Sequence, residues 1–222
     1  MKKLLSVLVT SALIFTSCLP AMQKVSYRTM AGASLAKYHQ ESSYMDESES
    51  SDSKAGFTAG VAADVGLAEQ FSVQPALNFV QKGGIQKYED EGDEYKSKIT
   101  LNYLELPVNF LFRPQSKSSV QFFVGAGPSL AMALSGKNKE TWPGGSDSEK
   151  LEIGNDPDKH DLKRMDFGAN FIAGIDTKMG FTVALNYNLG LSNVAPGDSD
   201  DGSIKNNYFG LKLGYIFKSK TK

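Results

Sequence analysis

Residues 101–112 have the sequence Leu101-Asn102-Tyr103-Leu104-Glu105-Leu106-Pro107-Val108-Asn109-Phe110-Leu111-Phe112. From Leu104 onward, every second side chain is large and apolar, whereas Glu105, Pro107 and Asn109 occupy positions between them. This period of two is typical of a β-strand with one apolar face. In a soluble sheet that face would point into the core. In a membrane barrel it would face lipid and leave the carboxylate in the lumen, so the fold class depends on which interpretation holds.

The N-terminus has the pattern of a secretory signal peptide. Lys2 and Lys3 precede an apolar run over 4–15, which is shorter than the roughly 20 residues that a spanning helix needs. Small residues follow up to Ala21. We predict that residues 1–21 are cleaved and that 22–222 form one domain. Cleavage before Cys18, which would make a lipoprotein, stays open because Thr16-Ser17-Cys18 loosely resembles a lipobox.

The composition excludes several function classes. The 222 residues contain one cysteine and carry a formal net charge of -1, which argues against a disulfide scaffold and against nucleic-acid binding. After the leader, no segment reaches the roughly 20 consecutive apolar residues of a membrane helix. If the mature protein spans a membrane, it must therefore do so as a barrel.

The alternation of residues 101–112 recurs along the chain. Strands are predicted within 25–38, 56–68, 71–82, 101–112, 120–134, 166–176, 181–191 and 209–217. Each is long enough for the roughly 9 to 11 residues that a tilted membrane strand requires. Long connections alternate with short ones, and the long ones, 39–55, 83–97, 135–162 and 193–205, are predicted to be external loops. We therefore predict an all-β fold, an eight-stranded antiparallel up-and-down transmembrane β-barrel.

Charged side chains fall on one face of the predicted strands. A charge on the lipid side near the bilayer midplane costs up to roughly 2–4 kcal/mol, so these residues are predicted to face the lumen. The predicted lumen polar network comprises Arg28, Asp64, Lys82, Glu105, Asp166, Asp176, Lys178 and Lys212. Side chains fill a barrel of this size. We expect a plug that conducts little or nothing, in which Glu105 pairs with Arg28 or Lys82.

Aromatic side chains on the apolar face gather near the predicted strand ends. The predicted lipid-interface aromatics are Phe71, Phe112, Phe181, Tyr215 and Phe217 at the periplasmic end, and Phe57, Phe79, Phe167 and Phe209 at the external end. Two bands of this kind are typical of the interface girdles of membrane barrels. A soluble lipocalin-like barrel, with the apolar residues around a ligand cavity, is the minor alternative. That alternative does not account for the clustering.

The sequence contains no strong motif for catalysis or metal binding. His39 and His160 both fall in predicted external loops, and a site formed by His39 with Ser42 or Ser43 is the catalytic alternative. No Gly-x-Ser-x-Gly motif supports it. The acidic runs, such as Asp198-Ser199-Asp200-Asp201, lack EF-hand spacing and are interpreted as a solvated rim. We predict no catalytic residue, no metal site and no organic cofactor.

Five short motifs resemble a known family in their order and spacing. They are Ser72-Val73-Gln74-Pro75-Ala76-Leu77-Asn78-Phe79-Val80-Gln81-Lys82-Gly83, Tyr103-Leu104-Glu105-Leu106-Pro107, Phe123-Val124-Gly125-Ala126-Gly127-Pro128, Leu185-Asn186-Tyr187-Asn188-Leu189-Gly190-Leu191 and Leu213-Gly214-Tyr215-Ile216-Phe217. Together they resemble the PorT-type outer-membrane β-barrel domain of Bacteroidetes. The resemblance implies an OmpA- or OmpX-like barrel in a Gram-negative outer membrane, with a terminal aromatic recognised by the barrel-assembly machinery. Ala76 departs from the family, which often has an acid there.

These observations predict a non-enzymatic, porin-like integral outer-membrane protein with an envelope-structural or surface-interaction role. The alternative is an accessory subunit of a protein secretion complex of the type IX kind, or of a transport complex. The expected partners are outer-membrane lipid, lipopolysaccharide and the barrel-assembly machinery. The alternative adds a secretion-complex partner. Nucleic acid is not expected, and a monomer is expected because a closed barrel has no free edge.

Overall fold

A computed structural model describes residues 25–42, 47–90, 92–156, 158–196 and 203–218. The predicted signal peptide, with Cys18, lies outside these residues. The strands are β1 (Val25–Ser42), β2 (Glu47–Ser50), β3 (Lys54–Gly66), β4 (Phe71–Asp90), β5 (Asp93–Phe112), β6 (Val120–Trp142), β7 (Gly145–Leu151), β8 (Met165–Thr177), β9 (Phe181–Gly190) and β10 (Ser203–Lys218). Within the described ranges, no helix is long and apolar enough to cross a membrane.

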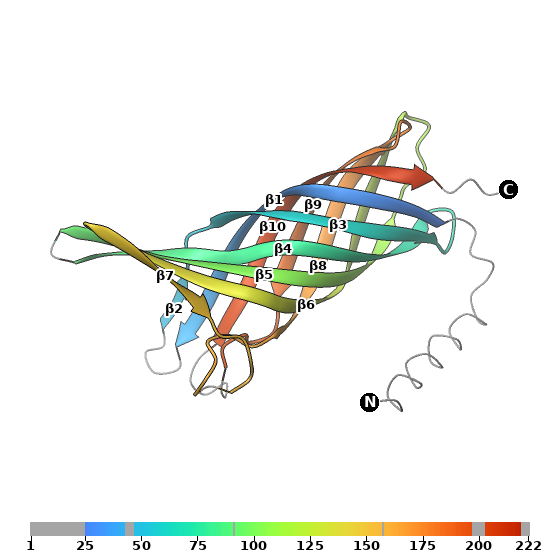
Figure 1. The fold of residues 1–222 in the computed structure, drawn as a ribbon. Helices are drawn as coiled ribbons and strands as arrows, with labels where there is room; N and C mark the ends of the chain where they lie inside the picture. Colours follow the sequence, from blue (N-terminus) through green and yellow to red (C-terminus); the bar gives the residue numbers. More distant parts are fainter. Residues whose placement is uncertain (1–24, 43–46, 91, 157, 197–202, 219–222) are drawn as a thin grey trace, which may run out of the picture.

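Most of these strands close into an antiparallel up-and-down barrel (Figure 1). The order around the wall is β1-β3-β4-β5-β6-β8-β9-β10, and β10 pairs back onto β1. This closing seam runs from the pair Ser26 and Lys218 to the pair Glu41 and Ser203. Closure leaves the wall without a free edge. The prediction of an all-β, eight-stranded up-and-down barrel is confirmed.

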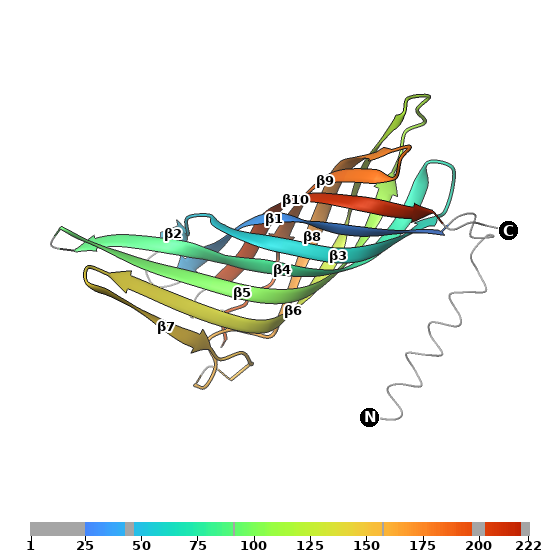
Figure 2. The same cartoon turned by 45° about the horizontal axis from the view of Figure 1, so that its top comes forward.

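The two ends of the barrel differ. Short turns join the strands at the end where the described termini lie, whereas strands β4 to β7 extend well beyond the wall at the other end (Figures 1 and 2). The prediction that 39–55, 83–97 and 135–162 are irregular loops is therefore wrong over much of their length. Ser- and acid-rich segments cannot bury a core, but a β-ribbon can pair its backbone groups without one. Across the β4–β5 ribbon, the rings of Tyr88 and Tyr95 stack with centroids 5.1 Å apart.

The faces of the strands have the arrangement of a membrane barrel. On the outer side, Phe110 is 62% exposed and Phe122 is 60% exposed. On the inner side, Glu105 is 0% exposed although it carries a charge. The soluble alternative, which places the apolar side chains around an internal cavity, is therefore wrong. Burial of polar groups inside and exposure of apolar groups outside is the pattern that lipid requires.

All nine predicted interface aromatics lie on the outer face. At the end with the termini, Phe71 packs against Phe112 with centroids 5.3 Å apart, and Tyr215 contacts both Phe181 and Phe217. At the other end, Phe57 stacks on Phe79 at 5.1 Å. Phe167 and Phe209, the other two aromatics predicted at that end, are also exposed on the outer face. Their contact with lipid stays a prediction.

A β-bulge changes the phase of β6. Asn102 of β5 pairs with Ser135, whereas the next residue, Tyr103, pairs with Ala133. The intervening Leu134 is therefore the extra residue of the bulge. Beyond it, the outer face of β6 passes from even to odd positions, so that Lys137 lies on the same side of the sheet as Thr100, its partner in β5. A strict period of two along β6 would instead place Lys137 on the inner face of the sheet.

Gly32 permits a close approach at the closing seam. A Cβ atom at this position would lie 1.8 Å from the backbone oxygen of Leu211 in β10. We expect Gly32→Ala to lower the free energy of unfolding by about 1–3 kcal/mol, because the backbone of β10 would have to move. Reversible urea unfolding in phospholipid vesicles measures this change. Ala33→Val, on the exposed face of the same strand, is the control and should change it by less than about 0.5 kcal/mol. An unchanged Gly32→Ala variant would contradict the close approach.

Candidate functional site

Arg28 of β1 organises a charged network at the end of the lumen near the termini. Its side chain is 1% exposed, and it forms ion pairs with both Asp64 of β3 and Asp176 of β8. The Nη1 atom donates to Asp176 Oδ1 at 3.2 Å, and the Nε atom donates to Asp64 Oδ2 at 3.1 Å. Gln74 and Thr182 donate to the same carboxylates. Both acids are thus matched by a charge and by neutral donors.

Arg113 adds a second cation to this Arg28 network. Its Nη2 atom lies 3.0 Å from Asp64 Oδ2, and its Nε atom lies 3.8 Å from Asp176 Oδ2. The two guanidinium groups also lie near one aromatic ring, since the Cζ atoms of Arg28 and Arg113 are 5.3 Å and 5.5 Å from the centroid of Phe123. Gly174 leaves room for that ring, because a Cβ there would lie 2.5 Å from Phe123 Cζ. Two cations and two anions make the network electrically balanced.

Apolar and amide side chains fill the middle of the lumen. Phe123 belongs to a buried apolar cluster with Met30, Leu111, Ile172 and Ala184. Further along the lumen, the amide of Asn170 donates to Asn109 at 2.9 Å. The amide of Asn188 donates to the hydroxyl of Ser129 at 2.7 Å. The middle of the barrel is thus occupied by side chains.

Lys82 of β4 organises a second charged network toward the external end. Its Nζ atom lies 3.0 Å from Asp166 Oδ2 and 3.6 Å from Glu105 Oε2. The hydroxyl of Tyr208 donates to Glu105 Oε1 at 2.7 Å. The ammonium group also lies 5.0 Å and 5.4 Å from the ring centroids of Tyr103 and Tyr208. All five side chains are buried, so the ion pairs of this Lys82 network are shielded from water.

External connections close the lumen above the Lys82 network. Leu162 and Val194, which lie outside the strands, are buried in one apolar cluster with Tyr103 and Tyr208. Backbone hydrogen bonds hold these segments together, since the N–H of Lys163 donates to the carbonyl of Val194 at 2.8 Å. The external end of the barrel is therefore covered by protein.

The opposite end is open. A cavity of about 720 Å³ lies at the end with the termini, and it is bounded by Arg28, Asp64, Arg113 and Asp176 together with the short turns. The floor of this cavity is therefore the Arg28 network itself. A solute that enters the lumen from this end meets the Arg28 network first.

The structure brings together most of the predicted lumen residues. Those buried inside the barrel are Arg28, Asp64, Lys82, Glu105, Asp166, Asp176 and Lys212. Lys178 does not join them, because β8 ends at Thr177 and the alternation ends with it; its side chain is exposed in the β8–β9 turn. Of the two partners predicted for Glu105, the structure shows Lys82.

Sequence reasoning missed four side chains that complete the two networks. Arg113 lies just beyond the predicted strand 101–112, and Phe123, Tyr103 and Tyr208 are not among the predicted lumen residues. The signal was present, because each has the phase of a neighbouring lumen residue: Arg113 follows Asn109 and Leu111 at a spacing of two, and Tyr208 precedes Lys212 by four. Extending the alternation by one residue beyond 101–112 and 209–217 would have identified Arg113 and Tyr208, and the alternation within the predicted strands already places Tyr103 and Phe123 on the lumen face.

The structure shows little that resembles catalytic or metal chemistry. The Nδ1 atom of His39 lies 2.9 Å from Ser50 Oγ, whereas Ser43 of the catalytic alternative lies outside the described residues. The acidic run 198–201 also lies outside them. In the part of the chain that is described, no three His, Cys, Asp or Glu side chains are grouped so that they could hold a metal ion.

Comparisons with known proteins give one family and a set of similar folds. The family described as "Outer membrane protein beta-barrel domain" matches residues 21–195. No curated protein matches the chain significantly in sequence. Similar solved structures include Ail of Yersinia pestis (17% identity, 88% of this chain and 100% of Ail, TM-score 0.42), Neisserial surface protein A (14%, 87% and 97%, 0.45) and OprG of Pseudomonas aeruginosa (9%, 88% and 97%, 0.47).

Proposed function

The chain belongs to the outer membrane protein β-barrel domain family, and on this basis we propose that it is a closed, non-enzymatic barrel that acts through its outer surface. Its location is the outer membrane, as the family establishes. The role proposed within the envelope is structural or one of surface interaction. We also propose that it acts as a monomer, because the closed wall offers no free strand edge.

The filled lumen is the observation that carries this proposal. Two charged networks, centred on Arg28 and Lys82, cross the interior at different depths, with apolar and amide side chains between them. Leu162 and Val194 cover the external end. A conducting pore would need a continuous aqueous path, and displacing buried ion pairs to open one is costly. The surface proposed to carry the function is the part of strands β4 to β7 that extends beyond the barrel wall.

We expect the folded protein to produce no ohmic single-channel steps in a planar bilayer at neutral pH. A larger porin inserted under the same conditions is the control that the bilayer reports open pores. Reproducible conductance steps from the purified barrel would overturn the closed-barrel proposal, because ions would then cross a lumen that the side chains are proposed to block.

A second candidate is the accessory subunit of a secretion complex. The five motifs that resemble the PorT-type domain of Bacteroidetes support it, and so does the polar cavity at the periplasmic end. A partner that inserts a polar segment there would contact Arg113 first, because its side chain is the more exposed of the two arginines. Copurification from crosslinked membranes tests this: a stoichiometric partner supports the second candidate, and recovery of only lipid and abundant neighbours supports the first.

A further inference from the structure

The extended part of strands β4 to β7 forms a four-stranded sheet outside the barrel wall, which we call the outer sheet. It comprises residues 83–90 of β4, 93–100 of β5, 136–142 of β6 and all of β7. One of its faces continues the inner side of the barrel, since Ile99 and Leu151 pack against the buried apolar cluster. The opposite face continues the side of the wall that carries Phe79 and Leu104. This second face therefore rises directly from the lipid-facing surface.

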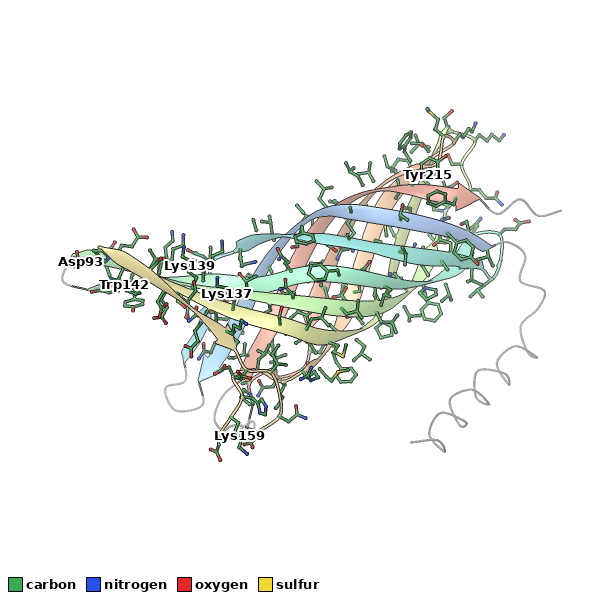
Figure 3. All side chains as sticks on the ribbon, viewed as in Figure 1. Asp93, Lys137, Lys139, Trp142, Lys159 and Tyr215 are labelled. Atoms are coloured by element: carbon green, nitrogen blue, oxygen red, sulfur yellow. The ribbon has the colours of Figure 1, made fainter. Side chains whose placement is uncertain are left out.

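Lysine residues gather on this lipid-side face. Figure 3 labels Lys137 and Lys139 on the extended part of the sheet, with Asp93 near its tip. The strand registers place six lysines on the same face: Lys87, Lys96, Lys98, Lys137, Lys139 and Lys150. We call this set the lysine face. The acids Glu140, Asp147 and Glu149 lie on the other face, and the lipid-side acids Glu89 and Glu94 lie near the tip of the ribbon.

The lysines oppose one another directly. Lys87 pairs with Lys96, Lys98 pairs with Lys139, and Lys137 pairs with Lys150 across neighbouring strands. Like charges at directly opposite positions destabilise a sheet. Three such pairs on one face concentrate positive charge that the fold itself does not require. An anionic ligand on this face would relieve the repulsion.

Acidic side chains do little to neutralise the lysine face. Lys87 lies 3.9 Å from Asp52, in a pair whose members are both largely exposed. Among the described residues, the other five lysines form no ion pair. The positive charge of this face also acts on Lys54, at the external end of β3. Burial lowers the pKa of Lys54, and the positive charge of Lys98 lowers it further.

The lysine face lies beyond the external end of the apolar surface of the wall. Next to Phe79 and Leu104, the amide of Gln81 donates to Asn102 at 3.0 Å, and the amide of Asn102 donates to Ser135 at 2.9 Å. This polar row marks the end of the apolar surface. Lys98 lies six residues beyond Leu104 along β5, which in a strand tilted by about 40° is a rise of roughly 15 Å. The lysines therefore stand above the hydrocarbon, beside the polar part of the outer leaflet.

We propose that the lysine face binds the phosphate groups of lipopolysaccharide in the outer leaflet around the barrel. The inference rests on the proposed function and names the partner of that outer surface. Lysine ammonium groups are compact charges with three donors each, which suits them to phosphate oxygens. The face points toward lipid rather than toward the cell exterior, so a membrane component reaches it more readily than a protein from outside. Glu140, Asp147 and Glu149 lie on the opposite face of the sheet, so their carboxylates do not face phosphate groups bound to the lysine face.

Titration of the folded, detergent-solubilised protein with lipopolysaccharide tests the proposal. A basic side chain at an anionic surface strengthens binding about fivefold, so the variant Lys98→Gln/Lys139→Gln should bind about 30-fold more weakly. The control variant, Lys117→Gln/Lys178→Gln, removes two exposed lysines at the opposite end of the barrel and has the same net charge. It should bind within about twofold of the unmodified protein, because surface charges beyond a Debye length are screened.

Three results would overturn the proposal. Equal losses in both variants would show a general effect of net charge, and unchanged binding by Lys98→Gln/Lys139→Gln would show that lipopolysaccharide binds elsewhere. Equal affinity for dephosphorylated lipopolysaccharide would show that phosphate is not recognised. Inorganic phosphate is the further probe: competition at concentrations comparable to those of lipopolysaccharide would indicate a site for free phosphate instead.

Folding and the closed-barrel proposal are tested separately. Without lipopolysaccharide, Lys98→Gln/Lys139→Gln should unfold in urea at a concentration equal to or above that of the unmodified protein, because it removes a repulsive pair. Weaker binding by a protein of equal stability cannot be attributed to misfolding. Single-channel recordings decide whether the lumen is closed without involving the lysine face, so either proposal can fail without the other.

Discussion

Lys82→Met is expected to lower the free energy of unfolding by about 3–5 kcal/mol. Lys82 is 1% exposed and forms ion pairs with both Glu105 and Asp166. Among the described residues, no other base forms an ion pair with either acid. The variant would leave two carboxylates buried in the lumen with only hydroxyl donors, from Tyr208 to Glu105 and from Ser192 to Asp166. Urea unfolding in phospholipid vesicles, followed by tryptophan fluorescence and circular dichroism, measures the loss.

Neutralising the acids should recover much of this stability. The triple variant Lys82→Met/Glu105→Gln/Asp166→Asn replaces the buried charges by neutral groups of similar size, and such replacements of buried ion pairs are often close to neutral. Lys178→Met is the control for loss of an exposed lysine and should change the free energy of unfolding by less than about 0.5 kcal/mol. If Lys82→Met has the same free energy of unfolding as the Lys178→Met control, the buried carboxylates of Glu105 and Asp166 are not stabilised by Lys82.

Arg28→Met is expected to cost about 3 kcal/mol, near the lower end of the range for a broken buried ion pair. Arg28 bonds both Asp64 and Asp176, but Arg113 remains beside the same two acids when Arg28 is removed. Gln74 and Thr182 also continue to donate to them. The same urea unfolding experiment measures the effect.

The two arginines should be strongly coupled. With Arg113→Met already present, removal of Arg28 leaves both acids without a cation in the Arg28 network, so the double variant should lose more stability than the two single variants added together. Residues in one ion-pair network show coupling free energies of roughly 0.5–3 kcal/mol. Additive effects would show that the arginines serve the acids independently, contrary to the shared contacts in the structure.

The strand pattern was predictable because alternation is a local property. The stretch 101–112 identified one apolar and one polar face, and the structure places Leu106 and Phe110 outside with Glu105 and Asn109 inside. The extensions of β4 to β7 were not predicted, since the composition of 83–97 and 135–162 excludes a buried core and composition was the only criterion available. Pairing of one ribbon with the next supplies the backbone hydrogen bonds that composition does not reveal.

The candidate site was predictable in content but not in its pairing. Arg28 and Asp176 are 148 residues apart in the chain, and closure of the barrel brings their side chains together. The lysine face depended on a still finer feature, the bulge at Leu134. That bulge moves Lys137 and Lys139 to the same side as Lys98, whereas strict alternation along β6 would have put both lysines on the inner face and Glu140 on the lipid side.

The sequence by itself determined that the strands have a charge-poor face for lipid and a polar face for the lumen, because each charged residue fixes the phase of its own strand. The tertiary structure alone decided which base neutralises which acid, that Arg113 rather than Lys178 completes the Arg28 network, and that the external lysines share one face. The physical reason is that burial cost acts on each residue separately, whereas an ion pair or a charged face needs the register between strands. Closure of the barrel and one bulge set that register.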